Sequence, residues 1–372
     1  MTRYFDLAQT SYWLLLVWLF GAGLVLYQMP KKTELVCGQL RKRYHWFTAL
    51  LLVAPYVLWT GYRSIAGDTY SYALLFRKAS ASFSAIPGTL FSDGKDPGFT
   101  ALMIFAKACG IRDYQHFFLL IAAFQMFCMV YTFRRYSSNF WFSFFLFIAS
   151  TDYVSWMQNG MRQFLAVCMT FAAFDLMVKR KYVRFALIVL VAMQIHGSAV
   201  IMLPIAYAIQ GKPLNRKTML IIIVTALCIP FIDWFMPILE NIMAETQYSD
   251  IMTNEIWSAD DGTNILRVAV YSAPALMVFL GRRYVVHSDD PAINQCINAS
   301  ILTMALYLVS MVTSGIYIGR LPIYTTLHGY MLLPWIIDQV FEKTSAKFIK
   351  LMVILCYIGF FYYQLGISWE ML

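Results

Sequence analysis

Three arginines and a histidine stand in apolar surroundings where ionisable side chains are costly. Arg63, Arg162 and Arg320 lie at the ends of long apolar runs, and His196 interrupts another. Such residues are rare in membrane proteins because burying a charge in lipid costs free energy, so they are candidates for function. Guanidinium groups bind phosphate oxygens in a bidentate manner. The arginines therefore predict a pyrophosphate site at the level of the lipid headgroups, and His196 is a candidate for proton transfer.

The composition indicates the class of protein that positions these residues. Of the 372 residues, 60% are hydrophobic and 13% are charged, and the mean hydropathy is +0.60. The apolar residues form runs of about 20, the length at which a helix crosses the hydrocarbon core of a bilayer. The runs are continuous rather than alternating, which favours helices over a barrel. We predict an all-α polytopic membrane protein with about 10–12 transmembrane helices, forming a single integral membrane domain over residues 1–372.

The distribution of charge predicts the orientation. Six basic clusters separate the apolar runs, at 31–43, 134–135, 179–184, 212–217, 282–283 and 343–350. Basic residues are enriched in cytoplasmic loops, so all six clusters are expected on that side. The net charge of +9 is then a topology signal and does not indicate binding of nucleic acid. The seven cysteines are scattered singly, without the spacing of a metal or redox site.

The expected helices follow from this topology. They cover 10–27, 46–62, 115–133, 139–151, 161–178, 218–236, 264–281, 297–314, 321–341 and 348–366. An outer-face segment at 63–114 is expected to hold an interfacial helix at 98–109. A second segment, 184–210, is too long for one span and too short for two, so we expect a re-entrant hairpin that turns at Gln194–Ser198. Residues 237–264 are expected to form an outer-face loop.

The costly polar residues fall into four short stretches of the predicted outer half: 63–72, 158–163, 194–198 and 315–324. Each has a structural alternative, in which an arginine reaches the membrane surface or a histidine is hydrogen-bonded within the helices. Arg162 argues against that alternative because it opens a helix, where a cation opposes the helix dipole. An anionic partner is therefore expected beside Arg162.

The order of four motifs resembles the EpsG family of Wzy-type exopolysaccharide and O-antigen polymerases. The motifs are GDTYSY at 67–72, KDPGFTALMIFAK at 95–107, NGMRQFLA at 159–166 and QIHGSAVIMLPIAY at 194–207. The positions that match the family are Asp68, Tyr72, Asp96-Pro97-Gly98-Phe99, Arg162-Gln163 and His196-Gly197-Ser198. This chain has Gly197 where many members carry lysine, which removes one cation from the predicted site.

The resemblance implies a polysaccharide polymerase in a bacterial cytoplasmic (inner) membrane, with a helical bundle similar to GT-C glycosyltransferases and an active site facing the periplasm. Such enzymes move the growing glycan from undecaprenyl pyrophosphate to the non-reducing end of a new lipid-linked repeat unit. The expected partners are the undecaprenyl-pyrophosphate-linked oligosaccharide, the lipid bilayer and a chain-length regulator protein. No metal and no cofactor is expected.

The roles of the residues follow from this reaction. Arg162 and Arg320, supported by Arg63, are expected to stabilise the leaving pyrophosphate. His196 is the favoured base for the acceptor hydroxyl, and Asp68 is the competing candidate. The predicted substrate-binding residues are Tyr72, Gln158, Gln163 and Tyr324.

Two other functions stay open at this point. A flippase for lipid-linked glycans is expected to carry ionisable groups at both leaflets and an internal repeat, whereas here these groups gather on one side. An O-antigen ligase shares the donor chemistry and differs in its acceptor, which the sequence does not reveal.

Overall fold

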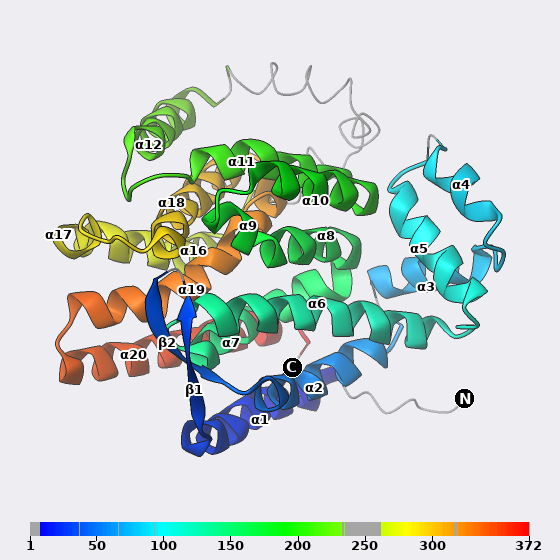
Figure 1. The fold of residues 1–372 in the computed structure, drawn as a ribbon, viewed down its shortest axis with the longest axis horizontal. Helices are drawn as coiled ribbons and strands as arrows, with labels where there is room; N and C mark the ends of the chain where they lie inside the picture. The colour runs from blue at the N-terminus through cyan, green and yellow to red at the C-terminus, as the bar shows by residue number, and fades with distance from the viewer. Residues whose placement is uncertain are drawn as a thin grey trace. The chain divides into compact units, whose positions relative to one another are not determined.

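The computed structural model describes residues 8–371 apart from 37, 66, 93, 233, 235–261, 316 and 317. Nearly all of the predicted outer-face loop 237–264 lies outside these residues. The chain divides into two compact units, the first made of Met1–Leu203 with Phe348–Leu372 and the second of Pro204–Lys347. Figure 1 shows that helices form almost all of both units.

The first unit contains most of the predicted site residues. Its elements are α1 (Ala8–Gln28), β1 (Lys31–Val36), β2 (Gln39–Tyr44), α2 (Trp46–Gly61), α3 (Asp68–Lys78), α4 (Ala85–Leu90), α5 (Pro97–Ala108), α6 (Tyr114–Tyr136), α7 (Phe140–Ala149), the π-helix η1 (Tyr153–Asn159), α8 (Met161–Ala172), α9 (Phe174–Val178), α10 (Tyr182–Ile195) and the 3₁₀ helix η2 (Gly197–Ile201). The π-helix η5 (Tyr363–Ser368) also belongs to this unit.

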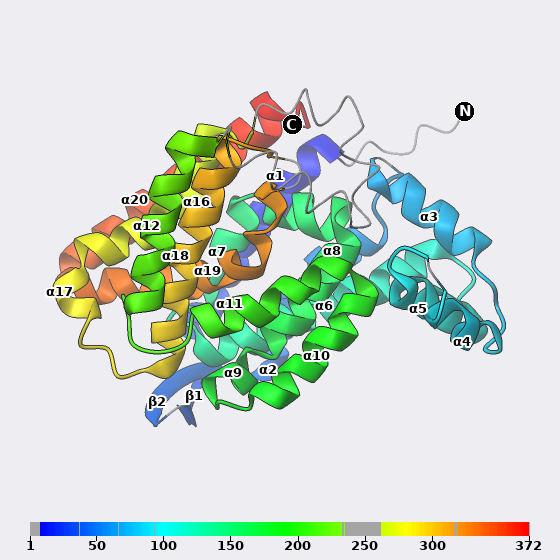
Figure 2. The same ribbon diagram turned by 90° about the horizontal axis from the view of Figure 1, so that it is seen from above.

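Helix α6 is the axis of the first unit and connects its two ends. It packs against α2 and α8, and it contacts α3 near its start and β2 near its end. Helices α3, α4 and α5 lie together near the start of α6 (Figure 2). Its 23 residues span about 34 Å at the rise of an α-helix. The β1–β2 hairpin and the α3–α5 group are therefore separated by about the thickness of a hydrocarbon core.

The second unit is built around α18 (Pro291–Met311). This helix packs against α12, α16 and α19. The elements of the unit are α12 (Arg216–Cys228), the 3₁₀ helix η3 (Ile229–Phe231), α16 (Ile265–Leu280), α17 (Arg282–Val285), α18, the 3₁₀ helix η4 (Ile318–Arg320) and α19 (Ile323–Val340). Two further helices, α11 (Met202–Ala208) and α20 (Lys343–Tyr362), cross the divisions between the units. Stacking of Tyr271 on Tyr307, with ring centres 4.6 Å apart, joins α16 to α18.

The helices confirm the predicted fold class. Four helical stretches are long and apolar enough to cross a bilayer. They are α6 (Tyr114–Tyr136), α8 with α9 (Met161–Val178), α18 (Pro291–Met311) and α20 with η5 (Lys343–Ser368). Seven shorter apolar helices accompany them in the described part of the chain. The protein is an all-α polytopic membrane protein. The predicted number of spans stays a prediction.

Four local features differ from the expectation. Residues 31–44 were interpreted only as a basic cluster, but they form the antiparallel hairpin β1–β2, in which Lys31 pairs with Tyr44. Gly38 turns the chain between the strands with a φ of +79°, a value that glycine adopts without steric cost. Helices α3 and α4 were not predicted, and α18 begins at Pro291 rather than at 297. Pro291 with the N-cap Asp290, which accepts from Ala292 and Ile293, is the start signal that was overlooked.

Candidate active site

An ion pair between Asp96 and Arg162 lies at the centre of the candidate site. Oδ2 of Asp96 and Nη1 of Arg162 are 2.9 Å apart, and their side chains are 2% and 24% exposed. Oδ1 of Asp96 accepts a hydrogen bond of 3.2 Å from the backbone N–H of Gly197. One carboxylate therefore joins the start of α5, the start of α8 and the break after α10. The anionic partner expected beside Arg162 is Asp96.

The backbone explains why Asp96 reaches both partners. Asp96 has a φ of +54° and precedes Pro97, the first residue of α5. Among non-glycine residues, aspartate and asparagine tolerate this left-handed conformation best. The left-handed turn at Asp96 therefore ends the preceding loop, and α5 begins at the next residue.

The ring of Tyr72 lies next to the guanidinium group of Arg162. The guanidinium carbon of Arg162 lies 5.6 Å from the centre of the Tyr72 ring, a distance at which a cation and a ring attract each other. The hydroxyl of Tyr72 donates to the carbonyl oxygen of Asn159 over 3.3 Å. Burial raises the pKa of Tyr72, and the charge of Arg162 opposes this effect. Tyr72 is therefore protonated at neutral pH, and its single O–H is the one that donates to Asn159.

Arg63 holds the segments around the site together. Nε donates to Thr69 over 3.0 Å, Nη1 to the carbonyl of Thr60 over 2.8 Å and Nη2 to the carbonyl of Gln158 over 3.2 Å. The side chain also lies over the Phe118 ring and is 7% exposed. Burial lowers the pKa of Arg63 to about 10, so it stays charged at neutral pH. These contacts place Arg63 between α2, α3 and η1, and its contact with pyrophosphate stays a prediction.

A break in the helix lies at Gln194–Ser198, where the turn of a re-entrant hairpin was predicted, and the re-entrant path stays a prediction. Helix α10 ends at Ile195, and His196 is extended with φ −157° and ψ 118°. Nδ1 of His196 lies 2.7 Å from Oγ of Ser198 and accepts from the backbone N–H of Ser198 over 3.4 Å. Gln163 donates to the same Oγ over 3.4 Å. The Arg-Gln pair thus connects to the start of η2, Arg162 through Asp96 and Gly197 and Gln163 through Ser198.

Two predicted residues of the first unit lie around this centre. Gln158 is buried in η1 and accepts a hydrogen bond from the hydroxyl of Tyr12 over 3.2 Å. Asp68 is exposed in the first turn of α3. Arg320 and Tyr324 belong to the second unit, where Arg320 is exposed at the end of η4 and Tyr324 is buried in α19. Their predicted contacts with the substrate stay predictions.

The site prediction omitted two residues that the structure places at the centre. Asp96 and Ser198 were recognised as motif positions without a chemical role. The signal for Asp96 was its acidic side chain between Lys95 and Pro97, in a segment that the topology places at the same end as Arg162.

Gly98 allows the close packing of α5 on α10. A Cβ atom at this position would lie 2.7 Å from the carbonyl oxygen of Gln194, closer than van der Waals contact permits. We expect Gly98→Ala to push the helices apart and to lower the free energy of unfolding by about 2 kcal/mol. Gly88→Ala, on α4 and with no atom within 4 Å of the new Cβ, is the matched control. Thermal unfolding in detergent measures both, and equal melting temperatures would contradict the close packing.

Comparison with known proteins supplies the family. The model of the EpsG family matches residues 46–368. The chain belongs to the EpsG family. The matched range includes all four motifs and every predicted site residue. A search of curated proteins found no match, and neither did a search of solved structures.

Membership of the EpsG family indicates a glycosyltransferase-like membrane enzyme of polysaccharide biosynthesis, with a function similar to that of a polysaccharide polymerase. The EpsG motifs are far apart in the sequence, yet their polar residues meet at one end of α6. This convergence is the expected arrangement for residues that act on one substrate.

Proposed function

We propose that this EpsG-family protein polymerises a polysaccharide, such as an O-antigen or exopolysaccharide. It moves the growing glycan from undecaprenyl pyrophosphate to the non-reducing end of a new lipid-linked repeat unit. The observation that carries the proposal is the convergence of Tyr72, Asp96, Arg162 and Gly197, one residue from each motif, with His196 next to Gly197. The proposal places the enzyme in the bacterial inner membrane with this site facing the periplasm, as the basic clusters predict.

The chemical step is one displacement at the anomeric carbon of the donor glycan. The acceptor oxygen forms a bond to this carbon while the bond to the pyrophosphate oxygen breaks, and the bonding electrons leave with the pyrophosphate. Negative charge on the leaving group grows in the transition state, so a fixed cation lowers the barrier. Arg162 is the candidate cation because Asp96 orients it through Nη1 while part of the side chain remains exposed.

The proton of the acceptor hydroxyl is assigned to Nε2 of His196. For this role Nδ1 carries the other hydrogen and donates to Oγ of Ser198, 2.7 Å away. This tautomer gives up the 3.4 Å hydrogen bond that an unprotonated Nδ1 accepts from the backbone N–H of Ser198, and it leaves the lone pair of Nε2 for the proton. Gln163 supports Ser198 from the other side. Asp68 is the competing base, and its exposed position on α3 equally suits orientation of the acceptor.

A single assay tests the proposed function. The purified full chain in lipid nanodiscs is given one synthetic undecaprenyl-pyrophosphate-linked repeat unit, and the products are separated on a gel. A ladder of repeat units is expected, and Arg320→Ala is expected to weaken it. Transfer only to an added, different acceptor would identify a ligase instead, and absence of any transfer would favour transport. The ladder is expected to persist in EDTA, because pyrophosphate is already a good leaving group; a loss that a divalent cation restores would contradict metal independence.

The base is tested by two substitutions in the same assay. We expect His196→Gln to lower the initial rate by about 100-fold or more, within the range of general base catalysis. Asp68→Asn is expected to change the rate less than tenfold. If Asp68→Asn is instead the more damaging change, the roles of the two residues are reversed.

A further inference from the structure

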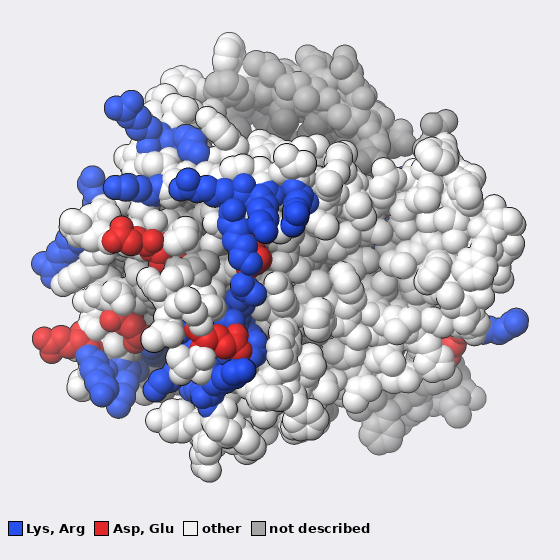
Figure 3. All heavy atoms as spheres, in the orientation of Figure 1, with Lys and Arg blue, Asp and Glu red and all other residues white. Residues whose placement is uncertain are grey.

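A polar hollow lies where the β1–β2 hairpin meets the ends of α1, α6 and α7. Its volume is about 210 Å³, and its lining includes Lys31, Lys42, Arg43 and Arg134, with no acidic residue. Figure 3 shows basic side chains gathered over the hairpin, whereas the surface over α3–α5 on the same face carries little charge. The hollow therefore lies at the opposite end of α6 from the candidate active site.

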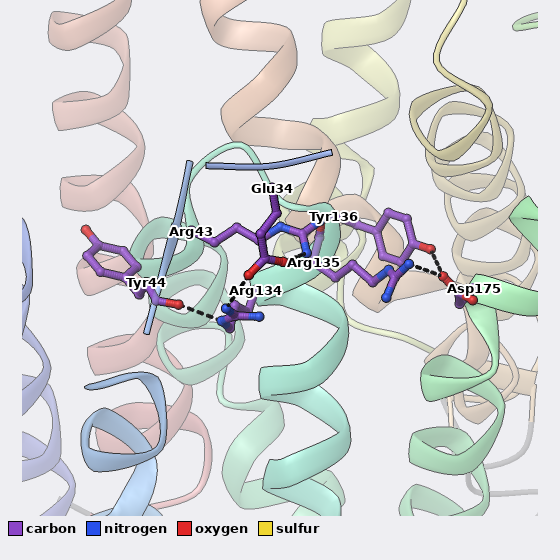
Figure 4. Close-up of polar contacts among 7 residues, drawn as sticks. All are labelled: Glu34, Arg43, Tyr44, Arg134, Arg135, Tyr136 and Asp175. Atoms are coloured by element: carbon purple, nitrogen blue, oxygen red, sulfur yellow. Dashed lines mark hydrogen bonds and ion pairs between the residues drawn. The ribbon is translucent and has the colours of Figure 1, made fainter. Parts of the chain in front are cut away.

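Both arginines of the hollow are buried, which a role in topology alone does not require. Arg43 is 5% exposed and Arg134 is 7% exposed. Both hold Glu34, at 2.8 Å and 3.0 Å, and Arg134 also donates to the carbonyl of Tyr44 over 2.6 Å. Figure 4 shows this cluster beside the separate contacts of Asp175. Within the described part of the chain, Nε of Arg43 is buried without a hydrogen-bond partner.

The cluster carries more positive charge than its own acid neutralises. Burial raises the pKa of Glu34, but the hydrogen bond and charge of Arg134, with those of Arg43, outweigh it and lower the pKa below its usual value. Glu34 is therefore ionised at neutral pH. Its single negative charge faces two arginines, and Lys31 and Lys42 add two exposed cations at the edge of the hollow. The net charge around the hollow is therefore positive, which favours the binding of an anion.

The surroundings indicate an amphiphilic ligand. Tyr27 and Trp141 also line the hollow, and aromatic residues of this kind concentrate at the level of lipid headgroups. On α1 next to it, Leu24 and Val25 are 72% and 55% exposed, as expected of a surface that faces acyl chains. A cationic hollow beside an apolar helix face fits a phosphate group that is attached to acyl chains.

We propose that this hollow binds the headgroup of an anionic phospholipid in the leaflet on the side of the basic clusters, the cytoplasmic leaflet in the predicted topology. Basic pockets between transmembrane helices bind such headgroups through their phosphates. The lipid would hold the hairpin against α6 and α7. This proposal stands independently of the reaction at the other end of α6.

Native mass spectrometry of the detergent-solubilised full chain tests the lipid site. Phosphatidylglycerol is expected to bind more tightly than phosphatidylcholine. The double variant Lys31→Gln/Lys42→Gln is expected to bind phosphatidylglycerol roughly 30-fold more weakly, the effect of two lysines near an anionic lipid surface. These exposed lysines leave the ion pairs of Glu34 in place.

The matched control is Lys343→Gln/Lys347→Gln, which removes two exposed lysines from another basic cluster. It is expected to keep the affinity for phosphatidylglycerol. An equal loss in the control, or equal binding of phosphatidylcholine, would overturn the proposal. Displacement of the lipid by millimolar inorganic phosphate would identify a site for the free anion and would also overturn it.

Discussion

Arg162→Ala is expected to lower the initial rate of polymer formation by about 100- to 1000-fold, the effect of losing one group that stabilises charge in a transition state. The expectation rests on the position of Arg162, which Asp96 holds at 2.9 Å and the Tyr72 ring borders at 5.6 Å. The measurement is the rate of ladder formation from a synthetic lipid-linked repeat unit. The affinity for that unit is measured in parallel, because a cation that acts mainly in the transition state changes the rate more than the affinity.

Two comparison variants separate the role of Arg162 from a general effect of charge. Arg162→Lys keeps the charge but loses the planar fork that binds phosphate oxygens, so an intermediate rate is expected. Arg112→Ala removes an exposed arginine near the start of α6 and is expected to leave the rate unchanged. If Arg112→Ala slows the reaction as much as Arg162→Ala, the assigned role of Arg162 is wrong.

Asp96→Asn is expected to lower the reaction rate at least tenfold and the free energy of unfolding by about 2 kcal/mol, the scale of a lost hydrogen bond to a charged group. Asparagine tolerates the positive φ of this position, and its carbonyl oxygen still accepts from Gly197. The variant therefore removes the charge that orients Arg162 and leaves the turn intact. The rate of ladder formation and the thermal unfolding of the same preparation measure the two effects.

The double variant Asp96→Asn/Arg162→Ala tests whether Asp96 acts through Arg162. If it does, adding Asp96→Asn to Arg162→Ala changes the rate little further, because residues in contact have non-additive effects. Additive losses would show that Asp96 acts on the substrate by another route. Asp113→Asn is the matched control, since Asp113 is an exposed N-cap and asparagine caps a helix equally well.

The helices were largely predictable because their signals are local. Long apolar runs gave α2 and α6 to within a few residues, and the polar stretch at 194–198 marked the end of α10. The β1–β2 hairpin was not predicted, because its basic residues were interpreted only as a signal for the cytoplasmic side. Its strands nevertheless flank a short turn with Gly38, which is typical of a hairpin. Short α3, with a polar composition, carries no membrane signal and depends on packing against α5 and η1.

The sequence by itself determined the class of protein, the family motifs and the unusual nature of Arg63, Arg162 and His196, because hydropathy and residue type are properties of short segments. Only the tertiary structure decided which polar groups meet. Asp96 reaches Arg162 because α5 packs closely on α10 at Gly98 and α10 in turn packs on α8, which carries Arg162. Arg63 points inward because three oxygen acceptors from separate segments surround it. Such pairings follow from long-range packing, since a buried charge is stable only where the fold supplies its partners.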